Sequence, residues 1–344
     1  MNKPLKITLL LVLLLLTLLL FILDILIGPV TIPVNHILGM VAGGEPVNPV
    51  WRTIITDFRL PKAITAVLAG MALSVSGMQM QTLFRNPLAG PYVLGISSGA
   101  SLGVALIILG LPVLFIRENI HPLSLWMQII AAWIGAAAVL LLIMAVSLRV
   151  RDIMTLLILG VLFGSATSAI VSIMQYFSHQ AQLKAFVIWS MGNLGSVSKE
   201  QLSVMSVTLA AGLIMALLSG KILNVLLLGE SYAKSMGLNI RFSRSIVFIS
   251  TSILAGTITA FCGPIGFIGI AVPHITRILF RSSDHRLLIP AVVFTGAIIM
   301  LLSDILSQLP GSEYTLPVNS VTALIGIPVV IWVIFRNEKI VHVS

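Results

Sequence analysis

Ile7–Leu23, ITLLLVLLLLTLLLFIL, is an uncharged and almost wholly aliphatic run behind the basic residues Lys3 and Lys6. A helix that spans a membrane needs about 20 mostly apolar residues. A secretory signal peptide is the alternative, but its apolar core is usually shorter than this run. In addition, Asp24-Ile-Leu-Ile-Gly28 follows in place of a cleavage site of small residues. We therefore expect this run to form a first membrane span.

The composition of the whole chain agrees with a membrane location. Of its 344 residues, 58% are hydrophobic and 9% are charged, and the mean hydropathy is +1.10. Soluble domains carry about 25% charged residues. The net charge of +9 does not indicate nucleic-acid binding, because the basic residues are scattered at the ends of apolar stretches. The single cysteine, Cys262, excludes an internal disulfide and a cysteine-based zinc site.

Further uncharged stretches predict the remaining spans. NPLAGP at 86–91 should form a turn, so that the next helix starts near Tyr92, and Cys262-Gly-Pro-Ile-Gly266 should divide another stretch into a long and a shorter helix. Every span should be helical, because open strands leave backbone groups unsatisfied in lipid. The sequence thus predicts an all-α polytopic membrane protein of about ten transmembrane helices, from stretches at 7–23, 63–84, 86–116, 119–148, 153–183, 201–220, 245–276, 287–303 and 314–335.

The basic residues predict the orientation of the chain. An even number of spans puts both termini on one side of the membrane. If that side is the cytoplasm, fourteen of the 20 Lys and Arg residues lie inside, and six lie outside: Arg52, Arg59, Lys62, Arg117, Lys184 and Lys199. Short cytoplasmic loops carry an excess of Lys and Arg. We therefore expect both termini in the cytoplasm.

Leu228–Leu238, LGESYAKSMGL, is a polar segment between apolar stretches, on the side predicted to be cytoplasmic. Gly229 and Glu230 suit the start of a helix, where a carboxylate meets the positive end of the helix dipole. Glu230 and Lys234 lie one turn apart, in the order that favours an ion pair. Gly237 then supplies a left-handed stop. A multi-span protein does not need such a helix to fold, so we expect this helix to be bound by another protein.

Small residues and prolines indicate how the spans pack. Gly95, Gly99 and Gly103 repeat every four residues, as do Gly160, Gly164 and Ser168, and this spacing lets two helices approach closely in lipid. Tight internal packing is the expected role, with a dimer contact or a pathway lining as the alternatives. Breaks in the last third favour this region as a pathway, because broken helices at membrane depth often line a cavity; they fall at Pro264, Pro273, Pro310, Pro317 and Pro328.

Several kinds of chemistry have no support in the sequence. It contains no G-x-x-x-x-G-K-[ST] loop for phosphate, no metal-binding spacing among its six dispersed histidines and no cluster typical of a catalytic site. Asp24 and Asp304 are the two acidic residues within apolar stretches, each near a span end, where pairing with a helix terminus is the expected role. We therefore expect the chain to form a transport pathway whose energy is supplied by another protein. A stand-alone ion-coupled secondary transporter remains the alternative, and an intramembrane enzyme is a third, less favoured one.

Seven motifs together resemble the permeases of ABC importers for vitamin B12 and iron siderophores, the FecCD type. They follow one another in the order and at the spacing of that family, over nearly the whole chain after the first span: Arg59-Leu-Pro-Lys62, Arg85-Asn-Pro-Leu-Ala89, Leu94-Gly-Ile-Ser-Ser-Gly99, Leu228–Leu238, Gly263–Gly269 with Val272–Arg277, Asp284-His-Arg286 and Leu316–Gly326.

The resemblance implies a fold and a set of partners. It implies one transmembrane permease domain over 1–344, in the cytoplasmic (inner) membrane of a bacterium, working as a homodimer and carrying an iron chelate (ferric siderophore or haem) or cobalamin. Two ATPase subunits would supply ATP and Mg²⁺, so that this chain itself would be neither an enzyme nor the holder of a cofactor or metal. An extracytoplasmic binding protein would deliver the substrate.

The resemblance also assigns roles to particular residues. The ATPase would contact a coupling helix at about 229–238, through Gly229, Glu230, Ala233, Lys234, Met236, Gly237 and Leu238. Arg59 and Lys62 would dock the binding protein, with anchoring of a span as the alternative. Asp152, Ile153 and Met154 would form a cytoplasmic gate. The chain departs from the family pattern at Thr315, at Val318-Asn319-Ser320 and at Gln308, where some members keep an acid, a Val-Gly-Val and an arginine.

Overall fold

A computed structural model describes residues 2–33, 36, 48–110, 125–150, 152–308 and 315–341. The regular secondary structure of these residues is helical throughout. The α-helices are α1 (Lys3–Leu26), α3 (Pro49–Thr53), α4 (Leu60–Leu83), α5 (Ile96–Ala105), α7 (Leu125–Arg149), α8 (Ile153–Tyr176), α9 (Gln180–Ser190), α10 (Lys199–Leu218), α11 (Gly220–Leu226), α12 (Glu230–Ser235), α13 (Ile240–Cys262), α14 (Ile268–Phe280), α15 (His285–Ser307) and α16 (Val318–Val341). Wider π-helical turns at Ile54–Arg59 and Leu106–Gly110 continue α3 into α4 and extend α5.

The lengths of the helices agree with the predicted spans. Within the described residues, seven helices are long and apolar enough to cross a membrane, and α1 has the highest mean hydropathy, 3.2. Three shorter apolar helices join them: α5 with its extension, α14 and the first part of α16. These two groups together match the prediction of about ten transmembrane helices, and the all-α polytopic fold is confirmed.

The helix α4 forms the centre of the bundle. It packs against α13, α14 and α15. In the continuous helix Pro49–Leu83 that α4 completes, 78% of the most apolar stretch of 18 residues is buried, against 22% for that of α1. The reason lies in its small side chains: Ala63, Ala66, Ala69 and Ala72 are fully buried. Gly77 even brings the α4 backbone against that of Gly269 in α14, where a Cβ on either glycine would overlap the other helix. Outer helices such as α1 instead expose long aliphatic side chains.

The repeated glycines serve internal packing, as expected, whereas Ser168 of the second repeat is exposed. A Cβ on Gly99 or Gly103 of α5 would overlap backbone carbonyls of α7, and a Cβ on Gly160 of α8 would overlap the carbonyl of Val93, just before α5. The helix α5 therefore lies between α7 and α8 at backbone contact. Close approach of this kind is how helices associate in lipid without a hydrophobic driving force.

Two helix boundaries differ from the predictions, and one agrees. The helix α5 begins at Ile96 rather than near Tyr92, because Gly95 has a left-handed φ of 75° that the preceding turn requires. The stretch 153–183 does not stay one helix, since α8 ends at Tyr176 and a separate helix, α9, begins at Gln180. The predicted break after Cys262 is confirmed: Gly263 has a φ of 75° and α14 starts at Ile268. Arg117 and Pro310, used above, lie outside the described residues.

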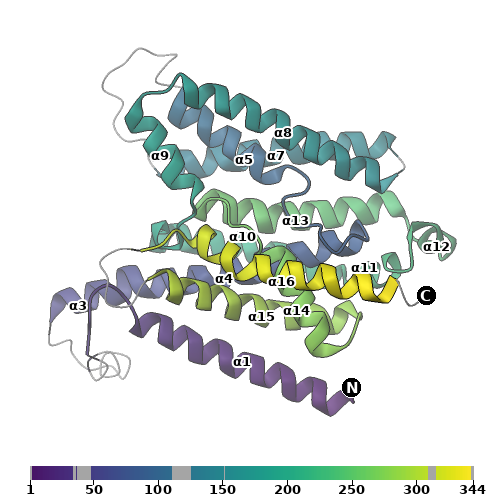
Figure 1. Ribbon diagram of the computed structural model, residues 1–344, viewed down its shortest axis with the longest axis horizontal. Coiled ribbons are helices and arrows are strands. Elements are labelled where there is room, and N and C mark those ends of the chain that lie inside the picture. The colour runs from purple at the N-terminus through teal and green to yellow at the C-terminus, as the bar shows by residue number, and fades with distance from the viewer. Residues whose placement is uncertain are drawn as a thin grey trace.

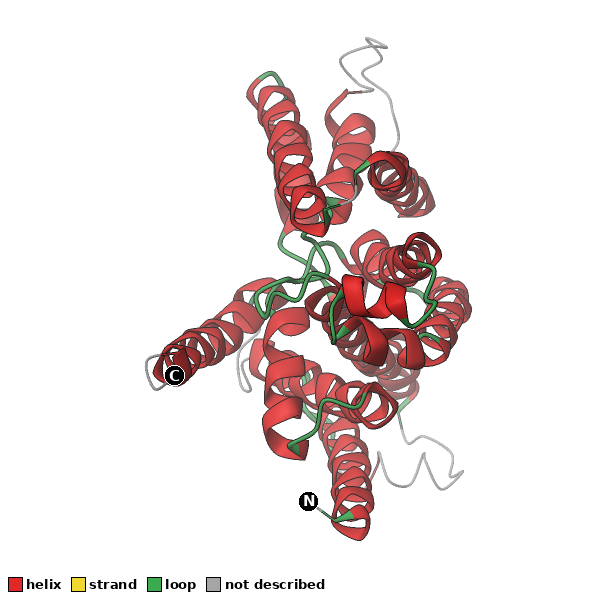
Figure 2. Cartoon of the chain, turned by 90° about the vertical axis from the view of Figure 1, so that its right-hand side faces the viewer, coloured by secondary structure: helices red, strands yellow, loops and turns green. Residues whose placement is uncertain are grey.

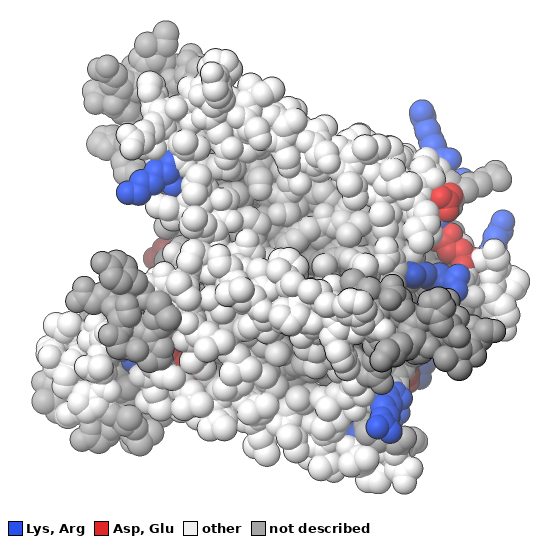
Figure 3. Space-filling view, viewed as in Figure 1, with Lys and Arg blue, Asp and Glu red and all other residues white. Residues whose placement is uncertain are grey.

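One end of the bundle collects the features that the sequence places in the cytoplasm. The start of α1, the end of α16 and the short α12 lie together at the right of Figure 1. Figure 2 views the helices from that end, with α12 in front. On the face shown in Figure 3, charged side chains gather at this end, fewer lie at the other, and the surface between is uncharged. This is the charge distribution of a protein that spans a bilayer.

Candidate functional site

The polar segment 228–238 folds as the predicted short helix, α12. Gly229 precedes it with a φ of 101°, which favours glycine. At its other end, Gly237 has a φ of 84° and donates its N–H to the carbonyl of Lys234, while Leu238 donates to the carbonyl of Ala233, both at 3.0 Å. This is the Schellman pattern of a glycine-terminated helix. The left-handed stop predicted at Gly237 is confirmed.

Glu230 in the first turn of α12 pairs with Arg244 in α13. The guanidinium donates from Nε to Oε1 at 2.8 Å and from Nη2 to Oε2 at 2.6 Å. The side chain of Arg244 is 4% exposed and that of Glu230 26%. The pair with Lys234 favoured by the sequence is not formed, because a planar guanidinium matches both carboxylate oxygens and a lysine ammonium does not. The acid therefore ties α12 to the central helix α13.

The remaining side chains of α12 divide into an anchor and an exposed surface. Ala233 is fully buried, whereas Tyr232 and Met236 are more than half exposed. Beside them, a cavity of about 660 Å³ is lined by Glu230 and Lys234 of α12, by Arg244, and by Val150 at the end of α7. Tyrosine, methionine and arginine are enriched where proteins dock. All seven residues predicted to couple to an ATPase thus lie in α12 or directly at its ends.

The three residues predicted as a gate form the start of α8, at the same end of the bundle. Asp152 caps the helix: its carboxylate accepts from the Thr155 hydroxyl at 2.8 Å, from the Thr155 amide at 2.9 Å and from the Met154 amide at 3.3 Å. These hydrogen bonds, led by that of the hydroxyl, lower the pKa of Asp152 below its usual value. Ile153 is half-buried and Met154 is exposed. The gating role itself stays a prediction.

Arg59, predicted to dock a partner, is held inside the molecule. Only 7% of the surface of Arg59 is exposed. The guanidinium donates to the carbonyls of Ile25 and Leu26 at 2.9 and 3.0 Å, and also to the carbonyl of Val30. These groups include the carbonyls left unpaired at the end of α1. Arg59 therefore acts as the cap of α1, in line with the anchoring alternative, and docking through it stays a prediction.

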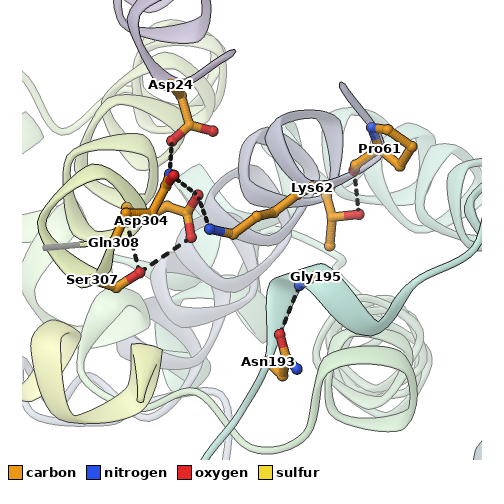
Figure 4. A network of polar contacts seen from close by, with 9 residues as sticks. Asp24, Pro61, Lys62, Asn193, Gly195, Asp304, Ser307 and Gln308 are labelled. Atoms are coloured by element: carbon orange, nitrogen blue, oxygen red, sulfur yellow. Dashed lines mark hydrogen bonds and ion pairs between the residues drawn. The ribbon is translucent and has the colours of Figure 1, made fainter. Parts of the chain in front are cut away.

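Lys62 belongs to a buried polar cluster that joins α1, α4 and α15 (Figure 4). Its ammonium lies 3.0 Å from Oδ2 of Asp304, which is 1% exposed. Gln308 donates from Nε2 to Asp24 at 3.0 Å and to Asp304 at 3.2 Å. The expectation that the two acids pair with helix termini is wrong, because their carboxylates find side-chain partners instead. Lys62, at the start of α4, and Asp304, near the end of α15, also line a cavity of about 430 Å³. These two helix ends lie opposite α12 in Figure 1.

Removing the cation of this cluster should destabilise the protein. Lys62→Met leaves the buried Asp304 carboxylate without its ammonium, and breaking a buried ion pair from one side costs about 3 kcal/mol. The double variant Lys62→Met/Asp304→Asn removes both charges and should regain most of that loss. Thermal unfolding in detergent measures both effects. A single variant as stable as the wild type would show that the ion pair contributes nothing.

The fold is that of a multi-pass membrane protein, and comparison with known proteins places it more closely. The model of the FecCD transport family matches residues 15–336, so the chain belongs to that family. The hemin transport system permease protein HmuU of Yersinia pestis is 37% identical over 294 residues, which cover 85% of this chain and 86% of the relative. The vitamin B12 import system permease protein BtuC of Salmonella paratyphi A is 35% identical over 300 residues, covering 87% and 89%.

A solved structure agrees with this assignment. It is a chain of an ABC transporter described as of the metal-chelate type, in an inward-facing conformation. It has a TM-score of 0.82 and 28% identity to this chain, covering 95% of it and 98% of the solved chain. The protein is therefore a FecCD-type permease of the ABC-importer class and a multi-pass protein of the bacterial inner membrane.

Proposed function

We propose that the chain is the membrane-spanning subunit of an ATP-driven importer for a metal chelate: a ferric siderophore, haem or cobalamin. The single observation that carries this is α12, a helix with two glycine-dependent ends, a buried anchor at Ala233 and an exposed face at Tyr232 and Met236. The bundle gains little from such a helix, whereas an ATPase subunit gains a defined contact. ATP and Mg²⁺ would bind to that subunit and not to this chain.

The proposed assembly is a homodimer with two ATPase subunits and one binding protein. The two copies would enclose the pathway between them, closed at the cytoplasmic end by Asp152, Ile153 and Met154. Support comes from the position of these residues at the same end as α12, where a displacement of the ATPase would act. The binding protein would dock at the opposite end, over the cavity that Lys62 and Asp304 line.

The substrate class is supported by the relatives. One is named for hemin, one for vitamin B12, and the solved transporter for a metal chelate. All three ligands are large organic molecules that enclose a metal ion. A bulky ligand of this kind would pass most readily along a wall without tight polar sites, and the described spans have their polar side chains largely paired within the bundle.

Reconstitution in liposomes tests the proposal. The permease is inserted with and without its ATPase and binding protein, and uptake of labelled haem, a ferric siderophore and cobalamin is measured. We expect accumulation only with all components and ATP. If the permease alone accumulates a substrate under a proton or sodium gradient, the secondary-transporter alternative is correct, and Asp24 and Asp304 become the first candidates for its ion site.

A further inference from the structure

Arg244 connects α13, in which it lies, to two other segments at the α12 end of the bundle. It lies in the first turns of α13 and is buried, with its bidentate pair to Glu230 directed toward α12. Its remaining terminal nitrogen, Nη1, donates to the carbonyl of Val150 at 3.4 Å. Val150 follows directly on α7 and stands two residues before Asp152, the cap of α8. One guanidinium thus joins α12 to Val150, which lies two positions before the first residue of the predicted gate.

We propose that Arg244 is a positioning residue that transmits displacements of α12 to Val150 and, from there, to the predicted gate residues Asp152–Met154. The proposal rests on the proposed function, because it takes α12 as the ATPase contact and Asp152–Met154 as the gate. It adds a physical link between α12 and the gate, because Arg244 is neither one of the predicted coupling residues nor one of the predicted gate residues. Arg244 touches no substrate in this role and acts through Glu230 and Val150.

The stiffness of the link follows from its chemistry. The start of α13 is fixed, because Asn239 caps it by accepting from the Phe242 amide at 3.1 Å and the helix is central in the bundle. The guanidinium is planar and presents its donors in a fixed fork. When α12 shifts, Glu230 displaces Nε and Nη2 of Arg244, which are hydrogen-bonded to it. Because the guanidinium is rigid, Nη1 must then move as well. The bond to the Val150 carbonyl is then either remade or lost, which alters the start of α8.

A lysine at this position would keep the charge but lose the fork. Its single ammonium can face Glu230, so α12 stays attached to α13, but it cannot also hold the Val150 carbonyl in a fixed geometry. Arg244→Lys therefore separates transmission from attachment. Arg286→Lys is the matched control, because Arg286 is an exposed arginine of α15 at the same end of the bundle and belongs to neither the docking helix nor the gate.

The experiment uses the full complex of permease, ATPase and binding protein in liposomes, with Met154→Cys as a reporter of the gate. Disulfide crosslinking between the two copies is followed with and without ATP, together with ATP hydrolysis and co-purification of the ATPase. For Arg244→Lys we expect normal co-purification, a crosslinking yield that no longer responds to ATP, and uptake lowered at least tenfold. Glu230→Gln, which weakens the same link from α12, should also blunt the crosslinking response. The control Arg286→Lys should respond like the wild type.

The possible failures are distinguishable. If Arg244→Lys crosslinks and transports like the wild type, the transmission role is wrong and the proposed function stands. If Arg244→Lys loses the ATPase, Arg244 serves docking alone and the proposal is also overturned. If the otherwise unchanged complex binds its ATPase but the crosslinking of the Met154→Cys reporter does not respond to ATP, the gate assignment falls together with the link. If ATP drives no uptake at all, the proposed function itself is wrong.

Discussion

Glu230→Lys should abolish ATP-driven uptake while the permease is still inserted in the membrane. The substitution places an ammonium against the guanidinium of Arg244, whose side chain is only 4% exposed, so that water screens the repulsion between the two charges poorly. Breaking a buried ion pair costs about 3 kcal/mol or more. Because Glu230 is partly exposed, we expect a cost of about 2 kcal/mol here, which lowers the equilibrium constant for α12 packed on α13 by roughly 30-fold. We expect α12 to detach from α13, and the bound ATPase to be lost.

Two further variants separate the causes. Glu230→Gln keeps the size of the side chain and at least one hydrogen bond from Arg244, so the ATPase should remain bound more tightly than with Glu230→Lys. Gly237→Val changes no charge but forces a β-branched residue to a φ of 84°, which should unwind the end of α12. Co-purification of the ATPase and uptake in liposomes are the measurements. Wild-type values of both for Glu230→Lys would remove α12 from the coupling mechanism.

Gly77→Ala should prevent the bundle from forming its native packing, although it adds a single methyl group. A Cβ at this position of α4 would overlap the carbonyl of Gly269 in α14, and the atoms that it would meet are backbone atoms, which cannot turn away as a side chain can. Overpacking a core costs about 1–3 kcal/mol when side chains can adjust. Here two helices must separate instead, so we expect a loss at the upper end of that range or beyond. The yield of monodisperse protein in detergent and its thermal unfolding should both fall.

Gly256→Ala is the matched control for this prediction. Gly256 also lies inside a central helix, α13, but a Cβ there would stand 3.6 Å from the Cβ of Ala136, which is an ordinary contact. Alanine stabilises a helix interior by about 0.5–1 kcal/mol relative to glycine. Gly256→Ala should therefore unfold at the same temperature as the wild type or slightly higher. If both glycine variants behaved alike, helix contact at Gly77 would not limit the stability of the bundle.

The features that sequence reasoning found are those whose cause is local. The stop at Gly237 follows from the conformations open to glycine, and the break after Cys262 from a Gly-Pro pair, so both were predictable from a few neighbouring residues. The apolar spans follow from composition over about 20 residues. The short helix α12 was likewise predictable from its own glycines and charges, and the family motifs added only its expected partner, an ATPase. None of these inferences required knowledge of which helices meet.

The features that sequence reasoning missed depend on distant partners. Asp24 and Gln308 are 284 positions apart in the chain and lie within hydrogen-bond distance in space. Arg59 looked exposed because a basic residue at a span end commonly faces water, yet here it closes the end of another helix. Arg244 counted only as one more cytoplasmic charge. Its position after the Asn239 cap, facing back toward Glu230, was the available signal.

The polar cluster of Figure 4 also bears on how the chain is made. Asp24 leaves the ribosome well before Gln308, which donates a hydrogen bond to it and follows 284 positions later in the chain. During biogenesis, Asp24 of α1 therefore lacks its hydrogen bond from Gln308 until α15 has been inserted into the bilayer. A chain that stops short of α15 keeps this polar defect, which an acid within the membrane makes costly. Completion of the cluster thus distinguishes a finished permease from a truncated one.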